Sequence, residues 1–266
     1  MVFNTIICII FFIDIQNSLK KTAFFSFNYV IQRYKSYIIA LHKIGAVALP
    51  ATAQLTAKDL EYRFNFAGVK GIICTADGEV SDYVDAAQKN CPSLELKVIA
   101  RGEKKGWISF TREVERADEN FPRPTGKEAN LTSDPMVMFF SSGTSGMPKL
   151  ACHDHAYALA HLFTAKHWQN VDPNGLHLTV AETGWGKALW GKLYGQWIME
   201  TAVFVYDFDK FDPVDLLSKI EKYKVTSFCA PPTIYRFFIK ENLADYDFSS
   251  LKYATTAGEA LNAAVF

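Results

Sequence analysis

The chain has 266 residues, a length that accommodates one large α/β domain or two smaller ones. Lysines and arginines number 28 against 28 aspartates and glutamates, so the balanced charge predicts no nucleic-acid partner and no attraction to an anionic membrane. The 5 cysteines have no close spacing, which favours reduced thiols in a cytoplasmic protein over a disulfide scaffold or a structural zinc site.

Residues 1–36 differ in composition from everything that follows. The run 2–13 is almost entirely Ile, Phe and Val, but Asn4 interrupts it and Asp14 ends it, so it is too short to span a bilayer. It also lacks the basic region and the cleavage site of a signal peptide. We interpret 1–36 as an atypical N-terminal segment, a replaced or misread N-terminus; a membrane anchor is the weaker alternative.

Strand and helix patterns alternate through residues 37–116, which we interpret as a first, partial α/β lobe. Thr56 and Asp59 form a capping-box pattern at the start of a helix that ends at Gly68. The other expected elements are helices at 36–43 and 82–89 and strands at 46–49, ended by Pro50, 71–75 and 96–100. This alternation predicts a parallel sheet with crossover helices.

The segment 117–134 is polar, holds two prolines and has no periodicity, so we predict that it links the first lobe to a second lobe, 135–266. The second lobe opens with the continuously apolar run 136–140, which is typical of a strand covered on both faces of a parallel sheet. Ligands bind at the ends of such strands, and here the strand leads into a polar loop.

That loop, 141–149, reads SSGTSGMPK and contains no acidic side chain. The loop supplies hydroxyls from Ser141, Ser142, Thr144 and Ser145. Gly143 and Gly146 let a ligand approach the backbone closely, and Lys149 supplies an ammonium group. Such a set suits a polyphosphate. The residues alone leave open a flexible Gly/Ser loop with a solvated lysine.

The loop differs from a Walker A motif. In that motif the lysine follows glycine directly, and a hydroxyl residue after it holds magnesium. Here Pro148 precedes Lys149 and removes a backbone donor, and Leu150 follows. A generic P-loop NTPase or kinase is therefore the weaker interpretation.

After the loop, 150–153 is predicted to be a strand, and Asp154 is predicted to cap a helix. Cys152, His153 and His155 cluster at this point. Neighbouring strand residues face opposite ways and the spacing does not suit metal ligands, so we predict no metal or thiol site. We expect the histidines to be polar packing, with the helix N-terminus lowering the pKa of His155.

Further strand-to-helix units follow. The predicted strands are 176–180, 202–206, 225–230 and 253–257, and the predicted helices begin at Asp212-Pro213, with Val214, Leu217 and Ile220 buried, and at Ile234. We expect Trp185 and Gly258 to follow strand ends on the same sheet edge as the loop 141–149. Trp190 and Trp197 are expected to be core aromatics.

The nine residues SSGTSGMPK resemble the signature loop of the adenylate-forming superfamily, which comprises acyl-CoA synthetases, luciferases and peptide-synthetase adenylation domains. The segments CHDHAYALAHLFTAKHWQNV and ETGWGKALWG are similar to acyl-CoA synthetases of the medium-chain and acetate-activating kind. The resemblance spans about residues 41–266. It implies a three-layer α/β/α fold with mainly parallel sheets, here the partial large N-terminal domain of an adenylate-forming enzyme.

In that family the loop grips the phosphates of ATP while a carboxylate attacks the α phosphorus. The resemblance therefore implies ATP and Mg²⁺ as cofactors, coenzyme A as co-substrate, and a small carboxylate such as a fatty acid as substrate. Lys149 and Thr144 become the catalytic candidates. By the same resemblance, the adenine is bordered by Gly258, Glu259 and Ala260, and the acyl pocket by Trp185 and Gly184. Ala260 replaces the usual proline, and Glu182 replaces the usual aspartate.

Several motifs of the family do not occur within the 266 residues: Y-G-x-T-E, whose acid engages magnesium, the ribose-binding aspartate, the hinge and the adenylation lysine. We therefore expect a fragment, truncated at its C-terminus, that does not complete the reaction by itself. The magnesium ligand is expected beyond residue 266. A non-catalytic ATP-binding remnant is the alternative.

Overall fold

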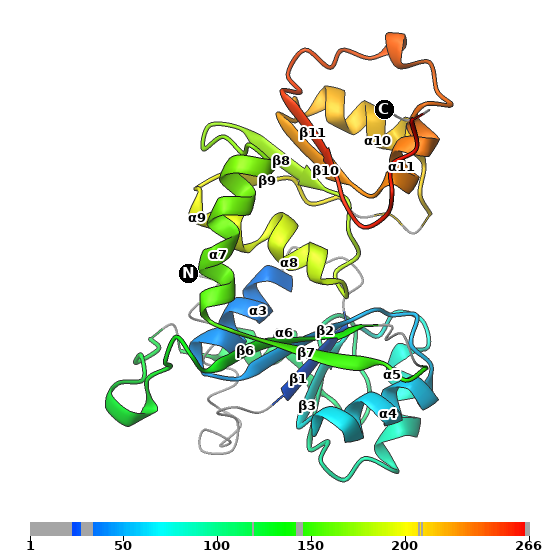
Figure 1. The fold of residues 1–266 in the computed structure, drawn as a ribbon. Helices are drawn as coiled ribbons and strands as arrows, with labels where there is room; N and C mark the ends of the chain where they lie inside the picture. The colour runs from blue at the N-terminus through cyan, green and yellow to red at the C-terminus, as the bar shows by residue number, and fades with distance from the viewer. Residues whose placement is uncertain are drawn as a thin grey trace. The chain divides into compact units, whose positions relative to one another are not determined.

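The computed structural model describes residues 34–118, 120–141, 146–206, 208 and 210–263, together with the backbone of Ala23–Phe27. The chain divides into two compact units. One comprises Met1–Ala156 with Thr183–Trp185, and the other comprises Tyr157–Glu182 with Gly186–Phe266. Each unit is built around its own sheet (Figure 1).

The sheet of the first unit has seven strands in the order β5-β4-β3-β1-β2-β6-β7. These strands are β1 (Ala23–Phe27), β2 (Val47–Ala51), β3 (Gly71–Cys74), β4 (Leu96–Ile99), β5 (Ile108–Ser109), β6 (Pro135–Ser141) and β7 (Lys149–Asp154). Neighbouring strands are parallel except for β6 and β7, which form an antiparallel pair. The sheet is therefore mainly parallel, as predicted.

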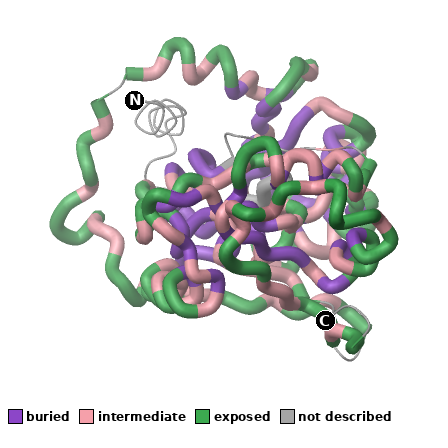
Figure 2. The backbone as a smooth tube through the Cα atoms, turned by 90° about the horizontal axis from the view of Figure 1, so that it is seen from above, coloured by how far each residue is buried: buried purple, intermediate pink, exposed green. Residues whose placement is uncertain are grey.

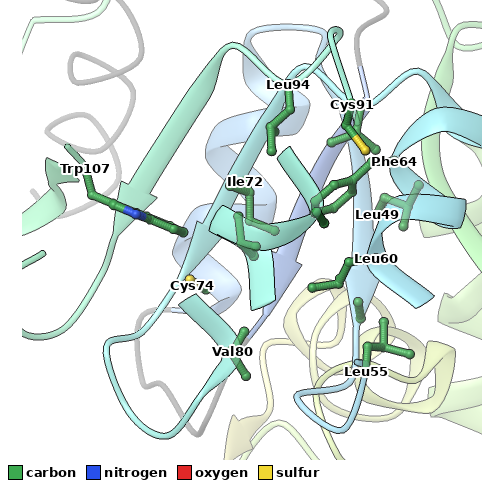
Figure 3. Close-up of a cluster of buried hydrophobic side chains, with 14 of the residues drawn as sticks. Leu49, Leu55, Leu60, Phe64, Ile72, Cys74, Val80, Cys91, Leu94 and Trp107 are labelled. Carbon is green, nitrogen blue, oxygen red and sulfur yellow. The ribbon is translucent and has the colours of Figure 1, made fainter. Parts of the chain in front are cut away.

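Helices cover both faces of this sheet, so the first unit has three layers (Figure 1). On one face lie α3 (Tyr34–Lys43) and α6 (Phe110–Arg116), where the rings of Tyr37 and Phe110 meet at 4.6 Å. On the other lie α4 (Ala57–Ala67) and α5 (Val80–Gln88). The core beneath α4 and α5 is drawn in Figure 3 and includes Leu49, Leu60, Phe64 and Ile72, all fully buried. Burial of each such side chain contributes about 1.5–3 kcal/mol.

Helix α4 begins and ends where the sequence predicts. The Thr56 hydroxyl accepts a hydrogen bond from the backbone N–H of Asp59, and the Asp59 carboxylate accepts one from the backbone N–H of Thr56 at 3.0 Å. Gly68 ends the helix at φ 59°, a left-handed conformation that glycine adopts without steric cost. These local signals set where the helix begins and ends.

Several features of the first unit differ from the sequence-based predictions. Strand β1 lies between β2 and β3, inside the segment 1–36 that was expected to precede the first lobe. Pro50 continues strand β2 rather than ending it, and β5 with α6 was not predicted. The expected linker 117–134 lies within the first unit, because β6 and β7 complete its sheet, and the unit boundary falls after Ala156.

The sheet of the second unit has four strands in the order β11-β10-β8-β9, all parallel. The strands are β8 (Leu176–Thr179), β9 (Ala202–Val203), β10 (Ser227–Ala230) and β11 (Tyr253–Thr256). The helical segments are α7 (Ala156–Phe163), the π-helical turn η2 (Thr164–Trp168), α8 (Gly186–Lys192), α9 (Tyr194–Ile198), α10 (Pro213–Lys222) and α11 (Pro232–Phe238). Two 3₁₀ turns, η1 (Gly126–Glu128) and η3 (Leu243–Asp245), lie in the first and second units.

Alternate residues of the second sheet face different helices. Leu178 and Phe228 pack with the buried faces of α10 and α11, while the Thr179 hydroxyl, on the opposite face, donates to the Gly191 carbonyl of α8 at 2.6 Å. The second unit is therefore also three-layered. The buried residues of both sheets are coloured purple in Figure 2.

Two burial predictions in the second unit are wrong. In α10, Leu216 is buried instead of Val214, which is 46% exposed, because the helix faces the sheet through Leu216, Leu217 and Ile220. Trp197, expected in the core, lies at 37% exposure near the end of α9. In the part of the chain that the structure describes, no helix is both long and apolar enough to cross a membrane.

Candidate functional site

The loop predicted to bind phosphate connects β6 to β7 as a β-hairpin, in which Ser141 pairs with Lys149. We call residues 141–149 the hairpin loop. Ser142, Gly143, Thr144 and Ser145 lie outside the described residues. Gly146 has φ 102°, a conformation that side chains rarely adopt, so glycine is required at this position.

Helix α4 fixes the base of the hairpin loop from one side. The Tyr62 hydroxyl donates to the Pro148 carbonyl at 3.2 Å. The Arg63 guanidinium lies 4.6 Å from the centroid of the Phe140 ring, and burial lowers its pKa while leaving it charged. These contacts hold both strands of the hairpin where the loop begins and ends.

Lys149 is the cation of the hairpin loop. Its side chain is exposed, and within the described residues it forms no salt bridge. The nine residues of the loop contain no acid that could neutralise the ammonium. This end of the hairpin therefore offers an unneutralised positive charge to an anion.

Gly184 presses against the end of strand β2. A Cβ atom at this position would lie 2.3 Å from the backbone C of Ala51 and 2.3 Å from the backbone N of Thr52, so only glycine fits. Because β2 and β6 are parallel neighbours, the end of β2 lies on the same sheet edge as the end of β6. Trp185, which we expected on this edge of the sheet, follows Gly184 in the chain. It is 61% exposed.

The predicted adenine segment belongs to the second unit instead. Strand β11 lies in the four-stranded sheet, so the expectation that Gly258 shares a sheet with the hairpin loop is wrong. The error arose because a continuous βα alternation was taken for one sheet. We call residues 257–260 the β11 turn. Gly258 there has φ 111°, and Ala260 is exposed.

Two helices hold the β11 turn. The Ala257 carbonyl accepts a hydrogen bond from the Lys187 ammonium of α8 at 3.1 Å. The Glu259 carboxylate accepts from the Thr233 hydroxyl at 2.7 Å and from the Arg236 guanidinium at 3.1 Å, both in α11. The Thr233 hydrogen bond, with Arg236 adding charge, holds the pKa of Glu259 below its usual value.

Sequence reasoning missed Lys187, Thr233 and Arg236. Lys187 lies 70 residues before Ala257 in the chain, and no local pattern joins them. Thr233 and Arg236 are three residues apart at the start of α11, a spacing that places both on one helix face. This spacing could have shown that Thr233 and Arg236 act together, but it did not identify Glu259 as their partner.

The Cys-His segment provides no evident metal centre. Among the described residues, no group of three His, Cys, Asp or Glu side chains could hold a metal ion. The ring of His155 packs 6.0 Å from that of the buried His42, and the ring of His153 packs 5.9 Å from that of Phe139. The pKa of His155 is lowered as predicted, but burial is the largest cause.

Comparison with known proteins identifies the family of this chain. The sequence model of the family described as AMP-binding enzyme matches residues 34–266. The chain is 30% identical over 225 residues to the human protein "Acyl-coenzyme A synthetase ACSM3, mitochondrial", covering 84% of this chain and 37% of the relative. It is 33% identical over 228 residues to human "Acyl-coenzyme A synthetase ACSM5, mitochondrial", covering 84% and 38%.

Solved structures support the fold. The structure of the anthranilate CoA ligase AuaEII in complex with anthranoyl-AMP superposes with a TM-score of 0.88 at 20% identity, covering 99% of this chain and 50% of that chain. An acyl-CoA synthetase from Brucella canis gives a TM-score of 0.81 at 18% identity, covering 99% and 47%.

The chain thus spans well under half the length of the two human relatives and matches the family model over nearly its whole described length. Two α/β units with mainly parallel sheets and the acid-free hairpin loop accompany that match. The chain belongs to the AMP-binding enzyme family, the adenylate-forming enzymes.

Proposed function

We propose that this chain is the nucleotide-binding part of an AMP-forming acyl-CoA synthetase. In the complete reaction, ATP and a small carboxylate such as a fatty acid give an acyl-adenylate and pyrophosphate, and coenzyme A then displaces AMP. The observation that carries the proposal is the hairpin loop, which contains no acid and presents the exposed Lys149 ammonium beside the carboxyl end of β6. The names of the human relatives support the substrate class.

Each predicted site residue has a part in this proposal. Lys149 and Thr144 stabilise negative charge on the leaving pyrophosphate, the electrostatic effect that dominates phosphate chemistry. Ser141, Ser142, Gly143, Ser145 and Gly146 surround the phosphates with hydroxyls and backbone. The adenine is bordered by Gly258, Glu259 and Ala260, and the acyl group by Gly184 and Trp185.

Magnesium would neutralise phosphate charge when it is bound with ATP. The hairpin loop contains no acid, and the described residues hold no cluster of three potential ligands. We therefore assign no residue of this chain to the metal and no step to it. Coenzyme A is likewise proposed as a co-substrate without an assigned residue.

The hairpin geometry does not favour a P-loop NTPase. A Walker A loop leads from a strand into a helix, which begins at its lysine and hydroxyl residues. Here the loop leads into strand β7, which begins at Lys149 and runs antiparallel to β6. Release of γ-phosphate from ATP in the absence of any carboxylate would support the NTPase interpretation against ours.

Calorimetric titration of the chain with ATP tests the proposal. Lys149→Ala removes the loop ammonium, and loss of one hydrogen bond to a charged group, about 1.5 kcal/mol, weakens ATP binding roughly tenfold. Lys105→Ala, which removes an exposed lysine in a surface loop, is the matched control and leaves the affinity unchanged. Equal ATP affinity of the Lys149→Ala variant and the wild type would refute the assignment of the loop.

A further inference from the structure

Hydrogen bonds from two helices restrain the β11 turn. A Cβ atom at Gly258 would meet nothing within 4 Å, so there is open space on that side of the turn. Its φ of 111° is a conformation in which only glycine is unstrained. Side chains of α8 and α11 reach the turn and bond to the residues on either side of Gly258.

Lys187 has an unusual environment for a lysine. Its side chain is half-buried, and burial lowers the pKa of its ammonium. Its one hydrogen bond within the described residues goes to a neutral acceptor, the Ala257 carbonyl, and it forms no salt bridge there. Placing a charge away from water without a carboxylate partner is unfavourable, so this contact is not explained by stability alone.

The carboxylate that acts on the Lys187 charge is bonded to other side chains. Glu259 is close enough to raise the pKa of Lys187, but its two oxygens are bonded to Thr233 and Arg236. The turn is thus tied at Ala257 to α8 and at Glu259 to α11. The two attachments lie on either side of Gly258, the residue with the least intrinsic conformational restriction.

We propose that Lys187 is a positioning residue for the adenine half of the nucleotide. Its hydrogen bond to the Ala257 carbonyl, together with the Arg236 and Thr233 contacts to Glu259, holds the β11 turn in the conformation that receives the base. This inference rests on the proposed function, which assigns the turn to adenine. A binding segment that is ordered in advance loses less conformational entropy when the ligand binds.

Binding of two partial ligands to the intact chain tests the inference. Lys187→Met preserves the length of the side chain and removes its donor. Adenosine, which carries the base without phosphates, should bind this variant about three- to tenfold more weakly than the wild type. Inorganic triphosphate, which has no base, should bind both proteins equally. Lys187→Arg retains a donor and should restore adenosine affinity to within about twofold of the wild type.

Lys192→Met is the matched control. The Lys192 ammonium of the same helix donates to the Ala181 carbonyl at 2.6 Å, so this variant removes a lysine donor away from the turn. It should bind adenosine as the wild type does. Unchanged adenosine affinity in Lys187→Met, or equal weakening of adenosine and triphosphate, would overturn the role of Lys187. A wild-type chain that binds triphosphate but no adenosine would overturn the adenine assignment itself.

Discussion

Substitution of Gly184 by alanine should distort the edge of the first sheet. The added Cβ would lie 2.3 Å from the backbone C of Ala51 and from the backbone N of Thr52 and 2.6 Å from the Ala51 carbonyl oxygen. Real Cβ contacts do not fall below 3.0 Å, so the segment or the end of β2 must move by at least 3.0 − 2.3 = 0.7 Å. The atoms in contact are backbone atoms, which cannot rotate away.

Overpacking of this kind costs about 1–3 kcal/mol. Gly184 does not have a positive φ, so the loss should come from the contact and not from the conformation of alanine. Gly68→Ala separates the two effects, because its Cβ meets nothing within 4 Å while its φ of 59° is left-handed. That control should cost about 1 kcal/mol from conformation alone.

Hydrogen exchange of the amides at the end of β2 is the suitable assay, because it reports locally on the contact. Gly184→Ala should accelerate exchange at Ala51 and Thr52, whereas Gly68→Ala should accelerate exchange at the end of α4. Wild-type exchange rates around Ala51 in the Gly184→Ala variant would show that the segment 183–185 does not press on β2.

Three further variants test the account. Asp212→Ala removes the acceptor for the first amides of α10 and should lower the unfolding free energy by about 1 kcal/mol in urea denaturation, with an unchanged value contradicting the cap. His42 is buried, which lowers its pKa to about 3, so below pH 6.5 the unfolded state binds the extra proton and stability falls with pH. His42→Gln should therefore reduce the slope of the unfolding free energy against pH, between pH 6.5 and 5, by up to about 1.4 kcal/mol per pH unit. An identical slope in the variant and the wild type would contradict the lowered pKa of the buried His42. The Asp85 carboxylate is bonded to the ammonium groups of Lys97 and Lys104 at 2.7 and 2.9 Å. Asp85→Ala removes this shared partner and should lower the unfolding free energy, measured by urea denaturation, by about 1 kcal/mol. An unchanged unfolding free energy would show that solvent screens both ion pairs.

Elements with strong local signals could be predicted from the sequence. Helix α4 follows from the capping box at Thr56 and from Gly68, and α10 follows from Asp212 before a proline, because each signal satisfies or replaces hydrogen-bonding groups at a helix end. The apolar run before the hairpin loop likewise predicts β6. These features require no knowledge of distant parts of the chain.

Features that depend on distant pairing could not be predicted. Nothing local to β8 or β11 states that these strands form a separate sheet, and nothing local to Ala23–Phe27 states that it inserts between β2 and β3. Gly184 contacts the backbone of Ala51, which lies far away in the sequence, so no local pattern indicates this contact. The Lys187 contact with Ala257 depends in the same way on the sheet order of the second unit.

Binding of a stable acyl-adenylate analogue, an acyl-sulfamoyl adenosine, tests the central claim most directly. If the chain holds the adenine, the phosphate region and part of the acyl pocket of an AMP-forming synthetase, the analogue should bind with 1:1 stoichiometry in calorimetry. Its affinity should exceed that of AMP at least about tenfold, because analogues of reaction intermediates engage several parts of a site at once. Binding no tighter than that of AMP, or none, would contradict the assignment of the chain to carboxylate activation.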